Sequence, residues 1–141
     1  MDDLDRAVKL DPRRAEFYNN RGVERFRLGD FSGAINHQTQ AIKINHDFDK
    51  AWNDCGAAQQ SKGDLDGALA DYNQAIKLDP RFAAAWFNRA TYWKAKGNLE
   101  LAEADFTQAI ELNPHWVDAY AQRGLVRLLS GRGGEAEEDF A

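Results

Sequence analysis

The feature that most constrains this chain is an internal repeat of 34 residues. The segment "DKAWNDCGAAQQSKGDLDGALADYNQAIKLDPRF", from Asp49 to Phe82, is followed at once by "AAAWFNRATYWKAKGNLELAEADFTQAIELNPHW". With Ala15 as position 1, the complete and partial repeats occupy residues 1–14 (positions 21–34), 15–48, 49–82, 83–116 and 117–141 (which stops at position 25). Recurrence at this period predicts similar structural units stacked in one array, and we treat residues 1–141 as a single domain.

Each repeat is expected to fold as two helices. Positions 4, 8 and 11 lie within one arc of a helix, and position 4 is always aromatic: Tyr18, Trp52, Trp86 and Tyr120. Glycine at position 15 should end the first helix, because it adopts the left-handed conformation without strain. Three polar residues that follow it can cap the second helix: Asp30, Asp64 and Asn98. Proline at position 32 should stop that helix.

The overall composition excludes several classes of function. Hydrophobic residues make up 43% of the chain and charged residues 29%, which is typical of a folded protein, and no apolar run could span a membrane. The net charge of −5 argues against binding nucleic acid, which needs a basic face. The only cysteine is Cys55, and the N-terminus has no signal-peptide core, so we expect a cytoplasmic location. Histidines lack metal-ligand spacing, and we expect no metal and no cofactor.

The residue types at these repeat positions resemble the pattern of the tetratricopeptide repeat family. The matching positions are an aromatic residue at 4, Gly or Ala at 8, Ala at 20 and 27, an aromatic residue at 24 and Pro at 32. The resemblance implies an all-α fold, a right-handed α-α superhelix of tandem helix-turn-helix repeats. The repeat at 15–48 departs from the pattern, with Gln38 at position 24 and His46 at position 32, and should pack less tightly than its neighbours.

The resemblance also implies that a peptide or protein binds the concave face, which the first helices should line. Position 6 carries short amides and one acid, which suit the main chain of an extended peptide. The candidate binding residues, with flanking positions, are Asn19, Asn20, Asn53, Asp54, Phe87, Asn88, Gln122 and Leu125. Family members that clamp a C-terminal carboxylate use a set of Lys, Asn and Arg residues of which this chain matches only Asn88, so such a clamp is not expected.

Arginine at position 7 and aspartate at position 23 predict ion pairs between repeats. If position 23 of one repeat meets position 7 of the next, the pairs are Asp3–Arg21, Asp71–Arg89 and Asp105–Arg123, and both columns break together at His37–Cys55. The alternative is that the arginines extend along their own hairpin to water. We interpret His37–Cys55 as a compatible neutral pair rather than a nucleophile and base, because no third group orients the histidine.

We therefore expect a non-catalytic scaffold for protein interaction. The alternative is a structural module that mediates self-assembly or packing within a larger polypeptide, because the chain begins and ends inside a repeat and its open ends could associate. Expected partners are a protein or peptide, with possible self-association, and neither nucleic acid nor membrane.

Overall fold

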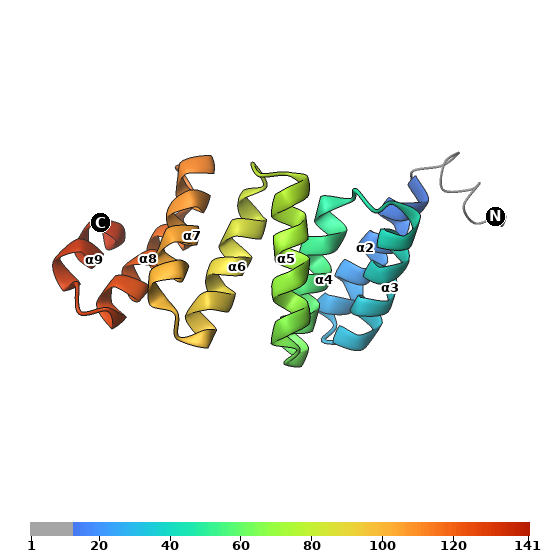
Figure 1. Ribbon diagram of the computed structural model, residues 1–141, viewed down its shortest axis with the longest axis horizontal. Helices are drawn as coiled ribbons and strands as arrows, with labels where there is room; N and C mark the ends of the chain where they lie inside the picture. Colours follow the sequence, from blue (N-terminus) through green and yellow to red (C-terminus); the bar gives the residue numbers. More distant parts are fainter. Residues whose placement is uncertain (1–12) are drawn as a thin grey trace. The chain divides into compact units, whose positions relative to one another are not determined.

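The computed structural model describes residues 13–141, and all regular secondary structure there is α-helical. The helices are α2 (Arg13–Arg27), α3 (Phe31–Ile44), α4 (Asp49–Lys62), α5 (Leu65–Leu78), α6 (Ala83–Lys96), α7 (Leu99–Leu112), α8 (Val117–Leu129) and α9 (Gly133–Phe140) (Figure 1). The all-α fold of tandem helical hairpins is thus confirmed. The predicted partial repeat at 1–14 falls almost wholly, and Asp3 entirely, outside the described residues.

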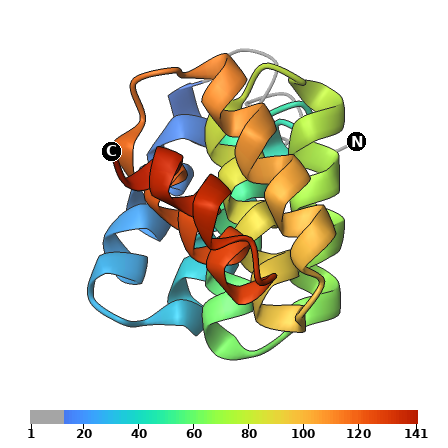
Figure 2. The same cartoon turned by 90° about the vertical axis from the view of Figure 1, so that its left-hand side faces the viewer.

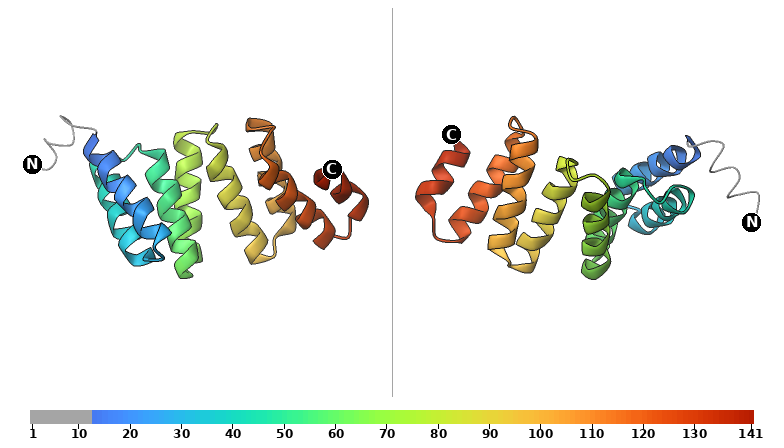
Figure 3. Two further views of the ribbon diagram at one scale, coloured as in Figure 1. Left: turned by 180° about the vertical axis from the view of Figure 1, so that it is seen from behind. Right: turned by 45° about the horizontal axis from the view of Figure 1, so that its top comes forward.

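The chain forms two compact units, Met1–Asp79 and Pro80–Ala141, which are described separately. In the first unit, α2 packs on α3 and α4 on α5, and in the second α6 packs on α7 and α8 on α9. The helices of each pair run antiparallel (Figure 3). Figure 2 shows the hairpin of α8 and α9 from another side. The single-domain organisation remains a prediction.

Local chemistry sets the helix ends as the sequence predicts. Glycines in the left-handed region follow each first helix, and their φ angles are 80° at Gly29, 99° at Gly63, 83° at Gly97 and 79° at Gly131. The side chains of Asp30 and Asp64 accept hydrogen bonds from the backbone N–H three residues later, at 2.9 and 3.1 Å. Asn98 caps α7 in the same way. The predicted caps are therefore confirmed.

In three of the four hairpins, the aromatic residue at position 4 is hydrogen-bonded to the loop before it. Trp52 Nε1 donates to the carbonyl of His46 at 2.8 Å, and Trp86 Nε1 donates to the carbonyl of Pro80 at 2.9 Å. The Tyr120 hydroxyl donates to the corresponding carbonyl at 3.1 Å. Because the bond requires only a carbonyl at position 32, a histidine serves there as well as a proline.

The hairpin cores depend on a small residue at position 8 beneath a large one at position 24. A Cβ on Gly56 would stand 2.7 Å from the ring of Tyr72, and a Cβ on Gly124 would stand 2.7 Å from the ring of Phe140. The first hairpin differs, because Gln38 takes the place of the ring. The sequence departure at position 24 therefore changes what fills the hairpin.

Candidate functional site

The predicted row at position 6 lies on the first helix of each hairpin. Asn20 on α2 is exposed, and the other three members are half-buried: Asp54, Asn88 and Gln122. All four therefore have some surface available to a ligand. The flanking asparagines differ, because Asn19 is only 6% exposed and Asn53 only 4%. These two lie inside the packing between helices, where they can orient neighbours but offer little open surface.

A recess in the first unit lies where the two first helices, α2 and α4, approach each other. Its volume is about 90 Å³, and we call it the α2–α4 recess; its lining residues are Val23, Phe26, Gln38, Asp54 and Ala57. The walls are mostly hydrocarbon, and the polar groups come from α3 and α4. A predicted binding residue, Asp54, therefore lines a concave feature of the first unit.

Burial raises the pKa of Asp54 to about 6. A hydrogen bond from the Asn19 side chain and the field of Lys50, one turn earlier on α4, oppose this shift. The carboxyl is therefore mainly ionised at neutral pH, but in surroundings that disfavour its charge. A cationic ligand would relieve that cost.

In the second unit the equivalent surface is bridged from within the chain. Lys94 Nζ on α6 donates to Gln122 Oε1 on α8 at 2.6 Å. Phe87 packs in the core, edge-on to Phe106 and stacked on Trp116 at a centroid distance of 4.5 Å. Leu125, in contrast, is exposed. The ring of Phe87, a predicted binding residue, is therefore already packed against other aromatic rings of the second unit.

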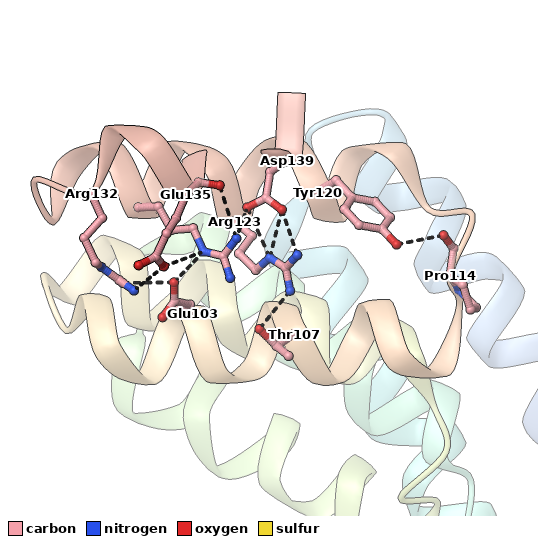
Figure 4. A network of polar contacts seen from close by, with 9 residues as sticks. Glu103, Thr107, Pro114, Tyr120, Arg123, Arg132, Glu135 and Asp139 are labelled. Atoms are coloured by element: carbon pink, nitrogen blue, oxygen red, sulfur yellow. Dashed lines mark hydrogen bonds and ion pairs between the residues drawn. The ribbon is translucent and has the colours of Figure 1, made fainter. Parts of the chain in front are cut away.

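The predicted partner of Arg123 was wrong. Arg123 Nη2 binds Asp139 of its own repeat at 2.7 Å, and Arg89 Nε binds Asp105 of its own repeat at the same distance (Figure 4 shows the Arg123 network). Arg123 also reaches the preceding hairpin, where Nη1 donates to Thr107 Oγ1 at 3.2 Å. The two helices of one hairpin thus bring positions 7 and 23 together across a separation of 16 residues.

The other two predicted ion pairs are not decided. Asp71 and Arg89 belong to different units, and Asp3 lies outside the described part of the chain. Their pairing therefore remains a prediction.

A further ionic cluster joins α7, α8 and α9 in the second unit (Figure 4). Glu103 Oε2 accepts from Arg127 Nε at 2.7 Å and from Arg132 Nη2 at 2.9 Å. Desolvation opposes ionisation of Glu103, but the two guanidinium donors outweigh it, so the pKa of Glu103 lies below its usual value. Arg127 also donates to Asp139 at 2.9 Å. These contacts all join neighbouring helices, and we interpret the cluster as structural.

Cys55 pairs with an acid and not, as predicted, with histidine. Its buried thiol interacts with Asp71 of the same repeat, and Gln59 Nε2 donates to its sulfur at 3.5 Å. His37 instead stacks on Tyr18. Burial, together with the charge of the nearby acid, raises the pKa of the thiol above its ordinary value, so the thiolate nucleophile is suppressed.

The environment of Cys55 predicts slow chemical labelling. In the folded chain at pH 8, a disulfide reagent such as DTNB should label it at least about a hundredfold more slowly than in urea, because only local opening exposes the thiol. Absorbance of the released thiolate measures the rate. Native labelling as fast as that of a small-molecule thiol would contradict the assigned burial and revive the nucleophile interpretation.

Residues 13–141 contain neither a metal-binding cluster nor a membrane-spanning helix. No cluster of three His, Cys, Asp or Glu side chains could hold a metal ion. No helix in the same range is long and apolar enough to cross a membrane.

Three family models match the sequence of this chain. Models described as "Tetratricopeptide repeat" match residues 15–48 and 83–115, and one described as "TPR repeat" matches residues 60–95. Together the matches extend over most of the chain, and those at 15–48 and 83–115 each cover one hairpin. The chain belongs to the tetratricopeptide repeat family. A search of curated protein sequences returned no match.

Solved structures share the fold of this tetratricopeptide repeat chain at low sequence identity. MamA aligns with a TM-score of 0.82 at 21% identity, covering 97% of this chain and 80% of that one. PilF of Pseudomonas aeruginosa aligns with a TM-score of 0.86 at 21% identity, covering 91% and 59%. The first tetratricopeptide repeat domain of Spaghetti (RPAP3), bound to the HSP90 peptide SRMEEVD, aligns with a TM-score of 0.83 at 21% identity, covering 86% and 98%. Members of this family typically serve as interaction modules.

Sequence reasoning missed the α2–α4 recess. The signal was present, because Gln38 breaks the aromatic column at position 24. The sequence indicated looser packing of that repeat but not that the space opens beside Asp54. Gln38, the residue that departs from the family pattern, therefore lines the same recess as Asp54, a candidate binding residue of this tetratricopeptide repeat chain.

Proposed function

We propose that this chain is a non-catalytic scaffold that binds a peptide or protein segment along the concave side of its first helices. The proposed contact residues are those of the position 6 row, Asn20, Asp54, Asn88 and Gln122, together with Leu125; Phe87, Asn19 and Asn53 support them from within the packing. Amides can both donate to and accept from a peptide main chain. The observation that carries the proposal is the α2–α4 recess, a concave feature that contains one of these residues.

The bound peptide of the Spaghetti domain supports the general class of partner and not its identity. That peptide, SRMEEVD, carries acidic side chains. This chain has a net charge of −5 and places Asp54 in its recess. Charge complementarity therefore favours a neutral or basic segment.

The test is selection from a random peptide library displayed on phage, followed by affinity measurement with the selected peptides. Replacing Asn20 and Asn88 with alanine should weaken binding by about 1–3 kcal/mol in total, because each amide contributes one or two hydrogen bonds. Fluorescence anisotropy of labelled peptides measures the change. Circular dichroism should show an unchanged fold, since Asn20 is exposed and Asn88 half-buried.

A matched control changes two amides on second helices, Gln40 and Gln108, to alanine and should leave affinity unchanged. If no peptide is enriched, or if both double variants bind equally well, the proposed surface is wrong.

A structural role in self-assembly is the second candidate. The face of α8 and α9 that contains Val117, Tyr120 and Phe140 forms a recess of about 370 Å³, and Val117 and Phe140 are exposed. Capture of only the chain itself from a mixture, together with a concentration-dependent mass in solution, would favour this candidate.

A further inference from the structure

The α2–α4 recess is lined by Gln38, which stands in the first hairpin where other hairpins have an aromatic ring. Tyr72 and Phe140 each cover the glycine at position 8 of their own hairpin. In the first hairpin, the narrower Gln38 amide lies over Gly22 instead. The recess lies beside this amide, and Val23 and Phe26 also line it.

Two of the residues that line the recess, Gln38 and Asp54, carry hydrogen-bond acceptors. Gln38 is only 1% exposed, and its Nε2 donates to the backbone carbonyl of Asn19 at 3.2 Å, which fixes the orientation of the amide. Its Oε1 is buried and has no hydrogen-bond partner. The Asp54 carboxyl lines the same recess. Acceptors buried without donors cost free energy, so a donor that reached them would bind favourably.

The second unit provides an internal comparison. There, position 12 of α6 is Lys94, and its ammonium binds the residue at position 6 of α8, Gln122. In the first unit, position 12 is Phe26 and position 6 of the next first helix is Asp54. Among residues 13–141, Lys50 acts on Asp54 through its field and not through a hydrogen bond. The first unit thus has the acceptor without the lysine.

We propose that the α2–α4 recess binds the side chain of a lysine from the partner, with the ammonium donating to Asp54 and Gln38 Oε1 and the stem packed between Val23, Phe26 and Ala57. This inference rests on the proposed function and specifies which residue the bound segment must offer. The net charge of −5 agrees with a basic segment.

The chemistry of the recess selects lysine over other side chains. Its acceptors come from two helices, α3 and α4, so they suit an ammonium with three rotatable donors better than the planar fork of arginine. An apolar side chain would pack on the hydrocarbon walls but leave these acceptors unsatisfied. An acid would meet the carboxylate of Asp54.

The direct test needs no knowledge of the natural partner. The full chain, labelled with ¹⁵N, is titrated with Nα-acetyl-lysine N-methylamide and, separately, with the norleucine analogue, which has the same stem without the ammonium. Saturable shifts are expected at the Gln38 side-chain amide and the Gly22 backbone amide. The norleucine analogue should bind about tenfold or more weakly, because it cannot form charge-assisted hydrogen bonds. Equal binding of the two compounds, or no saturable shift with the lysine compound, overturns the proposal.

Two variants control the test. Gln38→Phe restores the ring found at position 24 of other hairpins and should abolish binding of the lysine compound while keeping the fold. Asp54→Asn keeps the shape of the site but removes its charge, and should also weaken binding about tenfold or more. It keeps the test decisive if Gln38→Phe does not fold. Unchanged binding in Asp54→Asn overturns the proposal.

The titration separates this inference from the proposed function. If the selected peptides show no preferred lysine, lysine binding in the recess is contradicted, and the proposed scaffold function stands. A library that yields no peptide would count against the scaffold function, and the lysine titration would still decide the recess chemistry.

Discussion

Replacing Phe106 with alanine should lower the free energy of unfolding by about 3–5 kcal/mol. Its ring is 0% exposed and packs with Ala90, Ala102 and Val126 in the core of the second unit, edge-on to Phe87. Truncation therefore removes buried hydrocarbon and leaves a cavity that rigid helices cannot close. Urea unfolding measures the loss, followed by circular dichroism and by tryptophan fluorescence, to which Trp116, stacked on Phe87, contributes.

Phe140 gives a matched control at the same repeat position. Its side chain is 52% exposed, so Phe140→Ala should cost less than about 1 kcal/mol. Because repeat proteins can unfold in parts, hydrogen exchange in α6 and α7 should show the same order. If the two variants lose equal stability, the assigned burial of Phe106 is wrong.

The helices and their ends were predictable because they depend on local rules. A left-handed glycine at position 15 and a capping Asp or Asn after it act within one turn, so the spacing alone locates them. The period of 34 residues then repeats the prediction along the chain. Trp52 illustrates a limit of this reasoning. The repeat pattern predicted an aromatic residue on the apolar face at this position, but it did not predict the hydrogen bond from Trp52 to the carbonyl of His46.

The residue types at positions 7 and 23 did not predict which neighbouring helix an ionic side chain contacts. Position 7 on a first helix lies within reach of two second helices, its own and the preceding one. Arg123 shows this directly, because it binds Asp139 on α9 and Thr107 on α7. The sequence lacks the arginine at Cys55 and the aspartate at His37, which favoured pairing each arginine with an aspartate of the preceding repeat. The structure instead pairs Arg123 with an aspartate of its own hairpin. The choice depends on distances that periodicity does not contain.

The candidate site was predictable in outline. The period of a helix predicts which residues share a face, and it placed Asp54 on the helix face that lines the recess. It also placed Asn19 and Asn53 beside an open groove, but both are buried. Whether a residue at the edge of a helix face is buried depends on how closely α2, α3 and α4 pack. Helical periodicity alone does not distinguish a buried residue at position 5 from an accessible one at position 6.

Replacing Gly56 with alanine should destabilise the first unit by about 2 kcal/mol, although alanine normally stabilises a helix by about 1 kcal/mol relative to glycine. The new Cβ would stand 2.7 Å from Cε1 of Tyr72 and 3.2 Å from the backbone oxygen of Ala68. The ring cannot move aside easily, because Tyr72 is 1% exposed and its hydroxyl is hydrogen-bonded to Gln60 at 2.8 Å. Thermal unfolding and urea midpoints measure the loss.

Gly124→Ala is the matched control, and a double variant tests the cause. Its Cβ would approach the Phe140 ring equally closely, but that ring is half-exposed and can swing toward water, so the net change should be within about 1 kcal/mol of zero. Combining Gly56→Ala with Tyr72→Leu should cost less than the sum of the two single changes, because the smaller side chain removes the clash. Strict additivity would show that Gly56 and Tyr72 do not act as a pair. It would also weaken the comparison with the first hairpin, where Gln38 lies over Gly22 in place of that ring.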